Sequence, residues 1–189
     1  MSCVCGYLDI ETTGLSPHTS ELTVVGLYIV PEKEKPRLLQ PYGDQISPRW
    51  LKRALADVDT VYTYNGRRFD LPFLEAKTGI PIERKWQHED LMYACWKRGL
   101  YGGLKAVERL LGIGRATTDI DGWMAVQLWH NYRLRGDRFS LNRLLHYNKE
   151  DVVNLSKLRT RLSQTEHLKD ASRRPAVPTH PRDPLGEGP

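Results

Sequence analysis

The sequence contains few cysteines, and their arrangement argues against a disulfide-rich protein and against a cysteine-ligated zinc protein. The chain has 3 cysteines among 189 residues, of which Cys3 and Cys5 are two positions apart and Cys95 is distant, so they do not form a disulfide framework. Without a second cysteine pair or nearby histidines they also make a poor zinc site. We interpret them as small apolar side chains of an intracellular protein.

Membrane and secretion signals are lacking as well. The longest apolar run, residues 22–30, contains Thr23 and Gly26, and it falls well short of the about 18 apolar residues that a spanning helix needs. No basic leader precedes Asp9 and Glu11, so we expect no signal peptide. These features predict a cytoplasmic protein with no membrane partner.

The sequence contains many charged residues of both signs, with a slight excess of basic ones. The 28 Lys and Arg residues exceed the 23 Asp and Glu residues, which gives a net charge of +5 and weakly favours an anionic partner. Apolar residues at 40% and charged residues at 27% are typical of a folded protein. Residues 171–189 differ, with five prolines and four apolar side chains. We therefore expect one domain over residues 1–165 and a proline-rich flexible tail over residues 166–189.

Hydrophobic periodicity and turn residues predict alternating strands and helices. Strands are expected at residues 3–10, 21–30, 37–40 and 60–64, with a further short strand near Trp86. Helices are expected at residues 49–56, 68–78, 90–98, 103–111, 120–132 and 140–163. The tight turns between the first three strands favour an antiparallel meander. The pattern as a whole predicts an α/β fold, a mixed sheet flanked by helices.

Two carboxylates stand at unusual positions in the first strand. Side chains alternate faces along a strand, so Asp9 and Glu11 share a face with Cys3, Cys5 and Tyr7. Burying two adjacent carboxylates without a cation costs several kcal/mol or forces protonation, and a divalent metal ion removes that cost. The alternative is that both lie at an exposed strand end.

The last helix presents a similar problem. Its buried stripe is defined by the leucines and the valine at positions 141, 144, 145, 152, 155 and 162. Asp151 falls on this stripe, Tyr147 lies one turn earlier at its edge, and no Lys or Arg lies one turn away on the same face. A carboxylate there needs a positive partner. Taken alone, Tyr147 is best interpreted as an ordinary core residue, and only the neighbouring aspartate makes its hydroxyl a candidate functional group.

Two more aspartates follow turns. Asp70 stands within the first helical turns after Asn65-Gly66, where helix capping is the alternative to a metal role. Asp90 opens a helix after His88-Glu89, and for this residue we expect capping rather than metal binding.

Together these residues resemble the motifs of a known superfamily. Asp9-Ile10-Glu11-Thr12-Thr13-Gly14-Leu15 is similar to the first motif of the DEDD exonucleases, and Asn65-Gly66-Arg67-Arg68-Phe69-Asp70 is similar to the second. Tyr147-Asn148-Lys149-Glu150-Asp151 resembles the third motif in its tyrosine form, that of the DEDDy branch. With the segment 103–113, the chain looks most like the YprB-type ribonuclease H-like domain over roughly residues 4–162.

The resemblance implies a ribonuclease H-like mixed five-stranded sheet, with the first three strands antiparallel, and a 3′–5′ exonuclease that uses two Mg²⁺ or Mn²⁺ ions. Carried over by motif position, the implied metal ligands are Asp9, Glu11, Asp70 and Asp151, with Asp9 bridging both ions. Tyr147 is implied to orient the attacking water. Asn65 and Phe69 match positions that contact the terminal nucleotides in relatives, and Thr12 is expected to help place the 3′-hydroxyl. The expected partners are 3′ ends of single-stranded DNA or RNA, with DNA slightly favoured.

Two other functions remain open from the sequence. One is a catalytically silent nucleic-acid-binding or regulatory module on the same fold; such proteins usually lose a carboxylate, whereas all four are present here. The other is a proofreading exonuclease that acts in trans with a polymerase. Basic residues at positions 67, 68, 97, 98, 133, 135, 138 and 143 are candidate phosphate contacts, or else a solvated basic face.

Overall fold

The architecture is a single mixed sheet with helices on both faces. The computed structural model describes residues 3–173, and side chains through residue 164. The strands are β1 (Cys5–Thr12), β2 (Leu22–Val30), β3 (Arg37–Leu39), β4 (Thr60–Thr63) and β5 (Gln87–Asp90). The helices are η1 (Gly43–Gln45), α1 (Pro48–Ala54), α2 (Asp70–Thr78), α3 (Ile82–Lys85), α4 (Leu91–Trp96), α5 (Leu104–Leu110), α6 (Gly122–Arg135) and α7 (Arg138–Arg173).

The sheet is mixed and five-stranded, as predicted. Its strand order is β3-β2-β1-β4-β5. The strands β1, β2 and β3 pair antiparallel, whereas β4 is parallel to both β1 and β5. The expectation of a five-stranded mixed sheet that begins with an antiparallel meander is therefore confirmed, and β1 occupies its centre.

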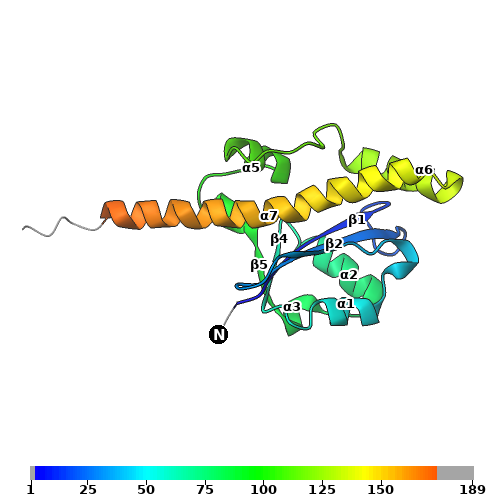
Figure 1. Ribbon diagram of the computed structural model, residues 1–189, viewed down its shortest axis with the longest axis horizontal. Helices are drawn as coiled ribbons and strands as arrows, with labels where there is room; N and C mark the ends of the chain where they lie inside the picture. Colours follow the sequence, from blue (N-terminus) through cyan, green and yellow to red (C-terminus); the bar gives the residue numbers. More distant parts are fainter. Residues whose placement is uncertain (1–2, 174–189) are drawn as a thin grey trace, which may run out of the picture.

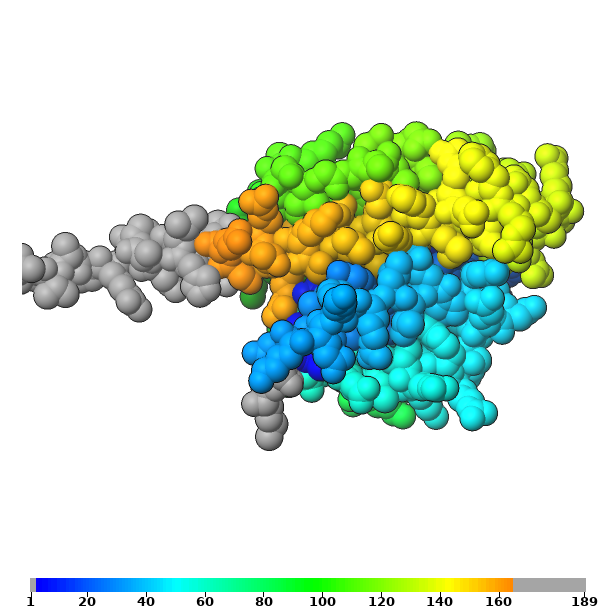
Figure 2. Space-filling view, viewed as in Figure 1, coloured from blue at the N-terminus to red at the C-terminus, as the bar shows by residue number. Residues whose placement is uncertain are grey.

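The two faces of the sheet carry separate cores. On one face Leu8 and Ile10 of β1 pack with side chains of α1, α2 and α3. On the other face Cys5 and Tyr7 pack with α4, α5 and α7. Figure 1 shows α1, α2 and α3 on one side of the strands, α7 crossing the other side, α5 beyond α7, and α6 alongside the first turns of α7. The space-filling view shows α7 between these two layers, with one side of the helix at the surface (Figure 2). The alternation predicted for the first strand therefore holds, and α7 lies over the face that carries Asp9 and Glu11.

Most element boundaries differ from the predicted ones by a few residues, and the largest difference is at the end of the last helix. The sequence pattern did not predict the short helix α3, and α7 is longer than predicted because it runs on to Arg173, past the expected domain end at residue 165. The rest of the predicted flexible tail, residues 174–189, lies outside the described residues. Over the part of the chain that the structure describes, no helix has the length and apolar character to cross a bilayer.

Candidate active site

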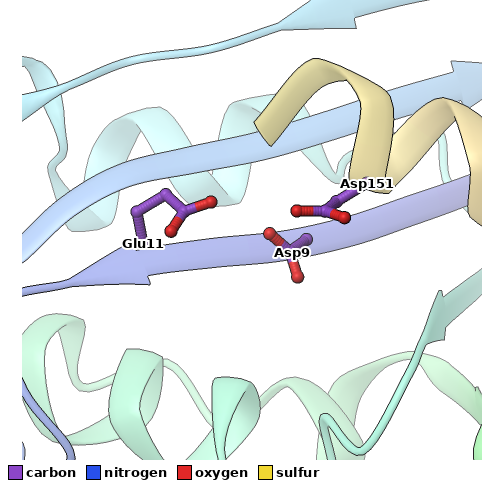
Figure 3. Close-up of side chains that lie close together, drawn as sticks. All are labelled: Asp9, Glu11 and Asp151. Atoms are coloured by element: carbon purple, nitrogen blue, oxygen red, sulfur yellow. The ribbon is translucent and has the colours of Figure 1, made fainter. Parts of the chain in front are cut away.

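Three carboxylates from two distant segments meet at the centre of the fold. Asp9 and Glu11 extend from β1, and Asp151 extends toward them from α7, so that one oxygen of each lies within 4.8 Å of the others (Figure 3). Glu11 is 8% exposed and Asp151 is 6% exposed, while Asp9 is half-buried. The alternative of an exposed strand end for Asp9 and Glu11 is therefore wrong.

The protonation behaviour of these groups reflects their crowding. Burial, and then the charges of Asp151 and Asp70, raise the pKa values of Asp9 and Glu11 well above their usual range. Burial also raises the pKa of Asp151 to about 6, although the neighbouring Arg115 acts in the opposite direction. Without a further cation, the mutual repulsion of the three carboxylates therefore destabilises the folded protein whenever all of them are charged.

The donor set fits a hard divalent cation. Every candidate ligand atom is a carboxylate oxygen, the type that Mg²⁺ and Mn²⁺ prefer. Among the described side chains Glu11 Oε1 is buried and has no hydrogen-bond partner, which an ion beside the three carboxylates would supply. The residues present therefore fit a metal site.

Asp70 lies beside this cluster but outside the group of three. It is the first residue of α2, is 5% exposed, and its Oδ1 accepts a hydrogen bond of 3.1 Å from the backbone N–H of Ile10, between Asp9 and Glu11. Burial raises the pKa of Asp70 to about 7. The fourth predicted carboxylate therefore contacts the backbone of β1, but its oxygens are not among those that lie within 4.8 Å of one another.

Asn148 holds Asp9 in place, and the sequence interpretation missed it. Its Nδ2 donates to Asp9 Oδ2 at 3.0 Å, and its Oδ1 accepts from Gln40 Nε2 at 3.0 Å. Gly26 of β2 pairs with Asp9, and a Cβ at Gly26 would lie 2.2 Å from Asn148 Oδ1. The glycine therefore provides the space in which this amide reaches Asp9. A glycine inside a buried strand is a known sign of such a close approach, so the signal was present in the sequence.

The positive partner of Asp151 is Arg115, in the connection between α5 and α6. Arg115 Nη2 donates to Asp151 Oδ1 at 2.5 Å, and Nε and Nη2 donate to Glu108 Oε2 and Oε1 at 2.8 Å each. These three side chains are 8% exposed or less. The prediction that Asp151 needs a cation is confirmed, but the cation comes from a loop rather than from a neighbouring turn of the helix.

The loop that carries Arg115 is fastened to α7 next to the carboxylates. The backbone N–H groups of Ala116 and Thr117 each donate to the Glu150 carboxylate at 2.8 Å, and the Thr117 hydroxyl donates to it as well. One turn further along α7, Asn154 Nδ2 donates to Gly114 O at 3.3 Å. The position of Arg115 is therefore set by the backbone around it as well as by its own ion pairs.

Tyr147 lies between the carboxylates and two cations. Its ring is half-buried, with Lys105 Nζ 4.6 Å and Arg115 Cζ 5.7 Å from the ring centroid. Burial, followed by the charges of Asp151, Glu11 and Asp9, raises the pKa of the Tyr147 hydroxyl. This hydroxyl therefore stays protonated at neutral pH and is suited to hydrogen bonding rather than to proton abstraction.

Of the predicted substrate residues, Thr12 ends β1, while Asn65 and Phe69 lie between β4 and α2. Asn65 adopts a left-handed backbone (φ 62°), and its N–H donates to Asp90 Oδ1 at 2.8 Å. Asp90 also accepts from Met92 N at the start of α4, which confirms its capping role. The Phe69 ring packs on that of Phe73, 5.7 Å between centroids. Thr12 Oγ1 donates to Gly14 O at 2.8 Å. Their contact with substrate remains a prediction.

Comparisons with known proteins match nearly the whole domain. A family model of the RNase H superfamily matches residues 6–163. The uncharacterized protein YprB of Bacillus subtilis (strain 168) is 27% identical over 172 residues, which cover 84% of this chain and 41% of YprB. The chain thus spans about two fifths of that relative.

Solved structures share the fold. The Brucella melitensis NrnC bound to pGG has a TM-score of 0.53 and 23% identity, covering 89% of this chain and 75% of that one. The family B DNA polymerase of Pyrobaculum calidifontis has a TM-score of 0.59 and 14% identity, covering 82% of this chain and 24% of that one.

Proposed function

Because the chain belongs to the RNase H superfamily, we propose that it is a metal-dependent 3′–5′ exonuclease of the DEDDy type. The observation that carries this proposal is the convergence of Asp9, Glu11 and Asp151, whose oxygens lie within 4.8 Å at a buried position. The proposed substrates are 3′ ends of single-stranded DNA, slightly favoured, or RNA. The structure of NrnC bound to pGG supports a short single strand as the kind of ligand.

Asp9, Glu11 and Asp151 would hold one divalent ion, and Asp70 would help to hold a second. The ions, when bound, supply acidity to the attacking water and charge stabilisation to the leaving 3′-oxygen. The remaining work falls to groups of the chain itself. Asn148 orients Asp9, Arg115 fixes one oxygen of Asp151 and leaves the other for a ligand, and the neutral Tyr147 hydroxyl positions the water.

The proposal is tested with 5′-labelled single-stranded DNA and RNA incubated with Mg²⁺, with Mn²⁺ or with EDTA. We expect a ladder that shortens from the 3′ end in the presence of either ion and no products in EDTA. Tight binding without a ladder under every metal condition would instead support the silent binding module. Products that shorten from the 5′ end would contradict the proposed polarity.

Replacing Tyr147 with phenylalanine tests the role proposed for its hydroxyl. Because poor placement of a reacting group by about 1 Å can cost about 100-fold, we expect kcat to fall by about 10–100-fold. The rise in melting temperature on adding Mg²⁺ should stay unchanged, since the carboxylates are intact. Tyr132→Phe, whose ring packs against Tyr42 on the α6 side, is the matched control and should keep full activity. Unchanged activity of Tyr147→Phe would contradict the role.

A further inference from the structure

A groove between α4 and α7 is separate from the carboxylate cluster and rich in cations. It has a volume of about 510 Å³, and its lining includes Arg67, Tyr93, Lys97, Arg98 and Arg159. Two acidic residues, Glu89 and Asp90, also line it. Arg67 also pairs with Glu83, which is outside the lining, and Asp90 accepts hydrogen bonds from backbone N–H groups of the turn that follows β4 and of α4. The four cationic side chains of the lining exceed its two carboxylates, so the lining carries a net positive charge.

We propose that this groove binds the sugar-phosphate backbone of a single-stranded nucleic acid, several nucleotides from the end that reaches the carboxylates. The inference rests on the proposed function for the identity of the ligand, but its evidence comes from a different part of the fold.

Arg159 is the strongest sign of an anionic ligand. Its Nη1 donates to Cys5 Sγ and to Tyr7 Oη, each at 3.3 Å, and its Cζ lies 4.4 Å from the centroid of the Tyr62 ring. Burial raises the pKa values of the Cys5 thiol and the Tyr7 hydroxyl, so both partners are neutral. Within the described side chains the guanidinium therefore has no carboxylate partner, and it retains N–H donors for a ligand.

The other side of the groove complements Arg159. Lys97 is exposed at the end of α4 and forms no ion pair with any side chain that the structure describes. Arg98 donates to Ala94 O and Leu162 O and so joins α4 to α7 along the groove. Tyr93 adds an aromatic face. Cations that follow a groove together with an aromatic ring are the usual features of a single-strand binding surface.

The position on α7 relates the groove to the proposed active site. Arg159 follows Asp151 by eight residues on the same helix, which corresponds to about 12 Å at 1.5 Å per residue. At about 3.4 Å per nucleotide in a helical strand, this is a span of about four nucleotides. The groove should therefore contribute to the binding of long strands and not of dinucleotides.

The test measures binding in EDTA, where no cleavage occurs, by the fluorescence anisotropy of 5′-fluorescein (dT)12 and (dT)2. We expect Lys97→Glu and Arg159→Gln each to weaken (dT)12 binding by about tenfold. The slope of log K against log[salt] should become shallower by about 0.7 for each phosphate that the variant no longer binds. Binding of (dT)2 should change less than twofold. The matched control is Lys52→Glu, an exposed charge reversal on α1 across the sheet, which should leave (dT)12 binding unchanged.

The outcomes separate the groove from the catalytic proposal. Selective loss of (dT)12 binding supports the groove even if the wild-type protein produces no ladder in Mg²⁺. Equal loss in Lys52→Glu, unchanged binding in both groove variants, or equal competition by a poly-glutamate peptide would overturn it. Because Lys97 is exposed, Lys97→Glu keeps the test valid if Arg159→Gln melts at a lower temperature.

Discussion

Asp9→Asn is expected to abolish metal-dependent cleavage while stabilising the metal-free protein. The substitution removes one of the three charged oxygens that meet within 4.8 Å, so we expect the rate to fall by about 10³-fold, as the loss of several kcal/mol of metal stabilisation implies. Asn148 still has a hydrogen-bond acceptor in the new amide, so the local geometry is retained. A fall of this size without unfolding would mark Asp9 as part of the reaction centre.

Although Asp9→Asn should lose activity, the metal-free variant should be more stable than the metal-free wild type, because the carboxylates repel one another when no cation is present. Removing the Asp9 charge relieves repulsion with Asp151, Asp70 and Glu11, which contribute, after burial, to its raised pKa. For a protein of this size each kcal/mol relieved corresponds to about 2–4 °C in melting temperature. Calorimetry in EDTA should show this rise, and the further rise on adding Mg²⁺ should disappear.

Asp59→Asn is the matched control for this prediction. Asp59 is exposed and lies just before β4. It accepts a hydrogen bond from the backbone N–H of Val4, which precedes β1, whereas Asp9 and Glu11 lie in the second half of β1. Its isosteric substitution should leave both cleavage and the Mg²⁺-induced rise intact. An active Asp9→Asn protein, or one that melts well below the wild type in EDTA, would contradict the assignment of Asp9 to a strained metal site.

The sequence predicted the parts of this fold that are encoded locally. Strand alternation placed Asp9 and Glu11 on one face, and the helical stripe placed Asp151 on the buried face of its helix, because each inference needs only residues within one element. The antiparallel pairing of the first three strands followed from turn lengths and from the resemblance, whereas the parallel pairing of β4 with β1 and β5 was not predicted. Two carboxylates on β1 and one on α7 therefore came together as expected.

The contacts that hold the site were not predictable in the same way. Arg115 is 36 positions before Asp151 in an irregular connection, and no periodicity relates the two. Asn148 reaches Asp9 only because β2 has a glycine where α7 crosses it, which is a property of packing between elements. Gly26 gave a detectable signal as a glycine in a buried strand, but its partner becomes evident only in the folded chain.

Arg115→Met is expected to produce the largest loss of stability of any single substitution considered. It leaves Glu108, which is 1% exposed, and Asp151 as buried carboxylates without their cation. Removing one member of a buried ion pair typically costs about 3–5 kcal/mol. Urea denaturation in EDTA should show this loss. Added Mg²⁺ should restore more stability to this variant than to the wild type, because the ion then supplies the missing positive charge beside Asp151.

Two further variants distinguish a buried charge network from a general effect of losing an arginine. The double variant Glu108→Gln/Arg115→Met removes the carboxylate that depends most directly on Arg115, so it should recover a large part of the stability lost by the single variant. Arg84→Met breaks an exposed pair of similar length, Arg84 Nη2 to Glu75 Oε1 at 2.7 Å, and should cost no more than about 1 kcal/mol. If Arg115→Met cost as little stability as Arg84→Met, Arg115 would not be the cation that stabilises the buried Asp151 carboxylate. Another group would then have to neutralise Asp151 in the metal-free protein.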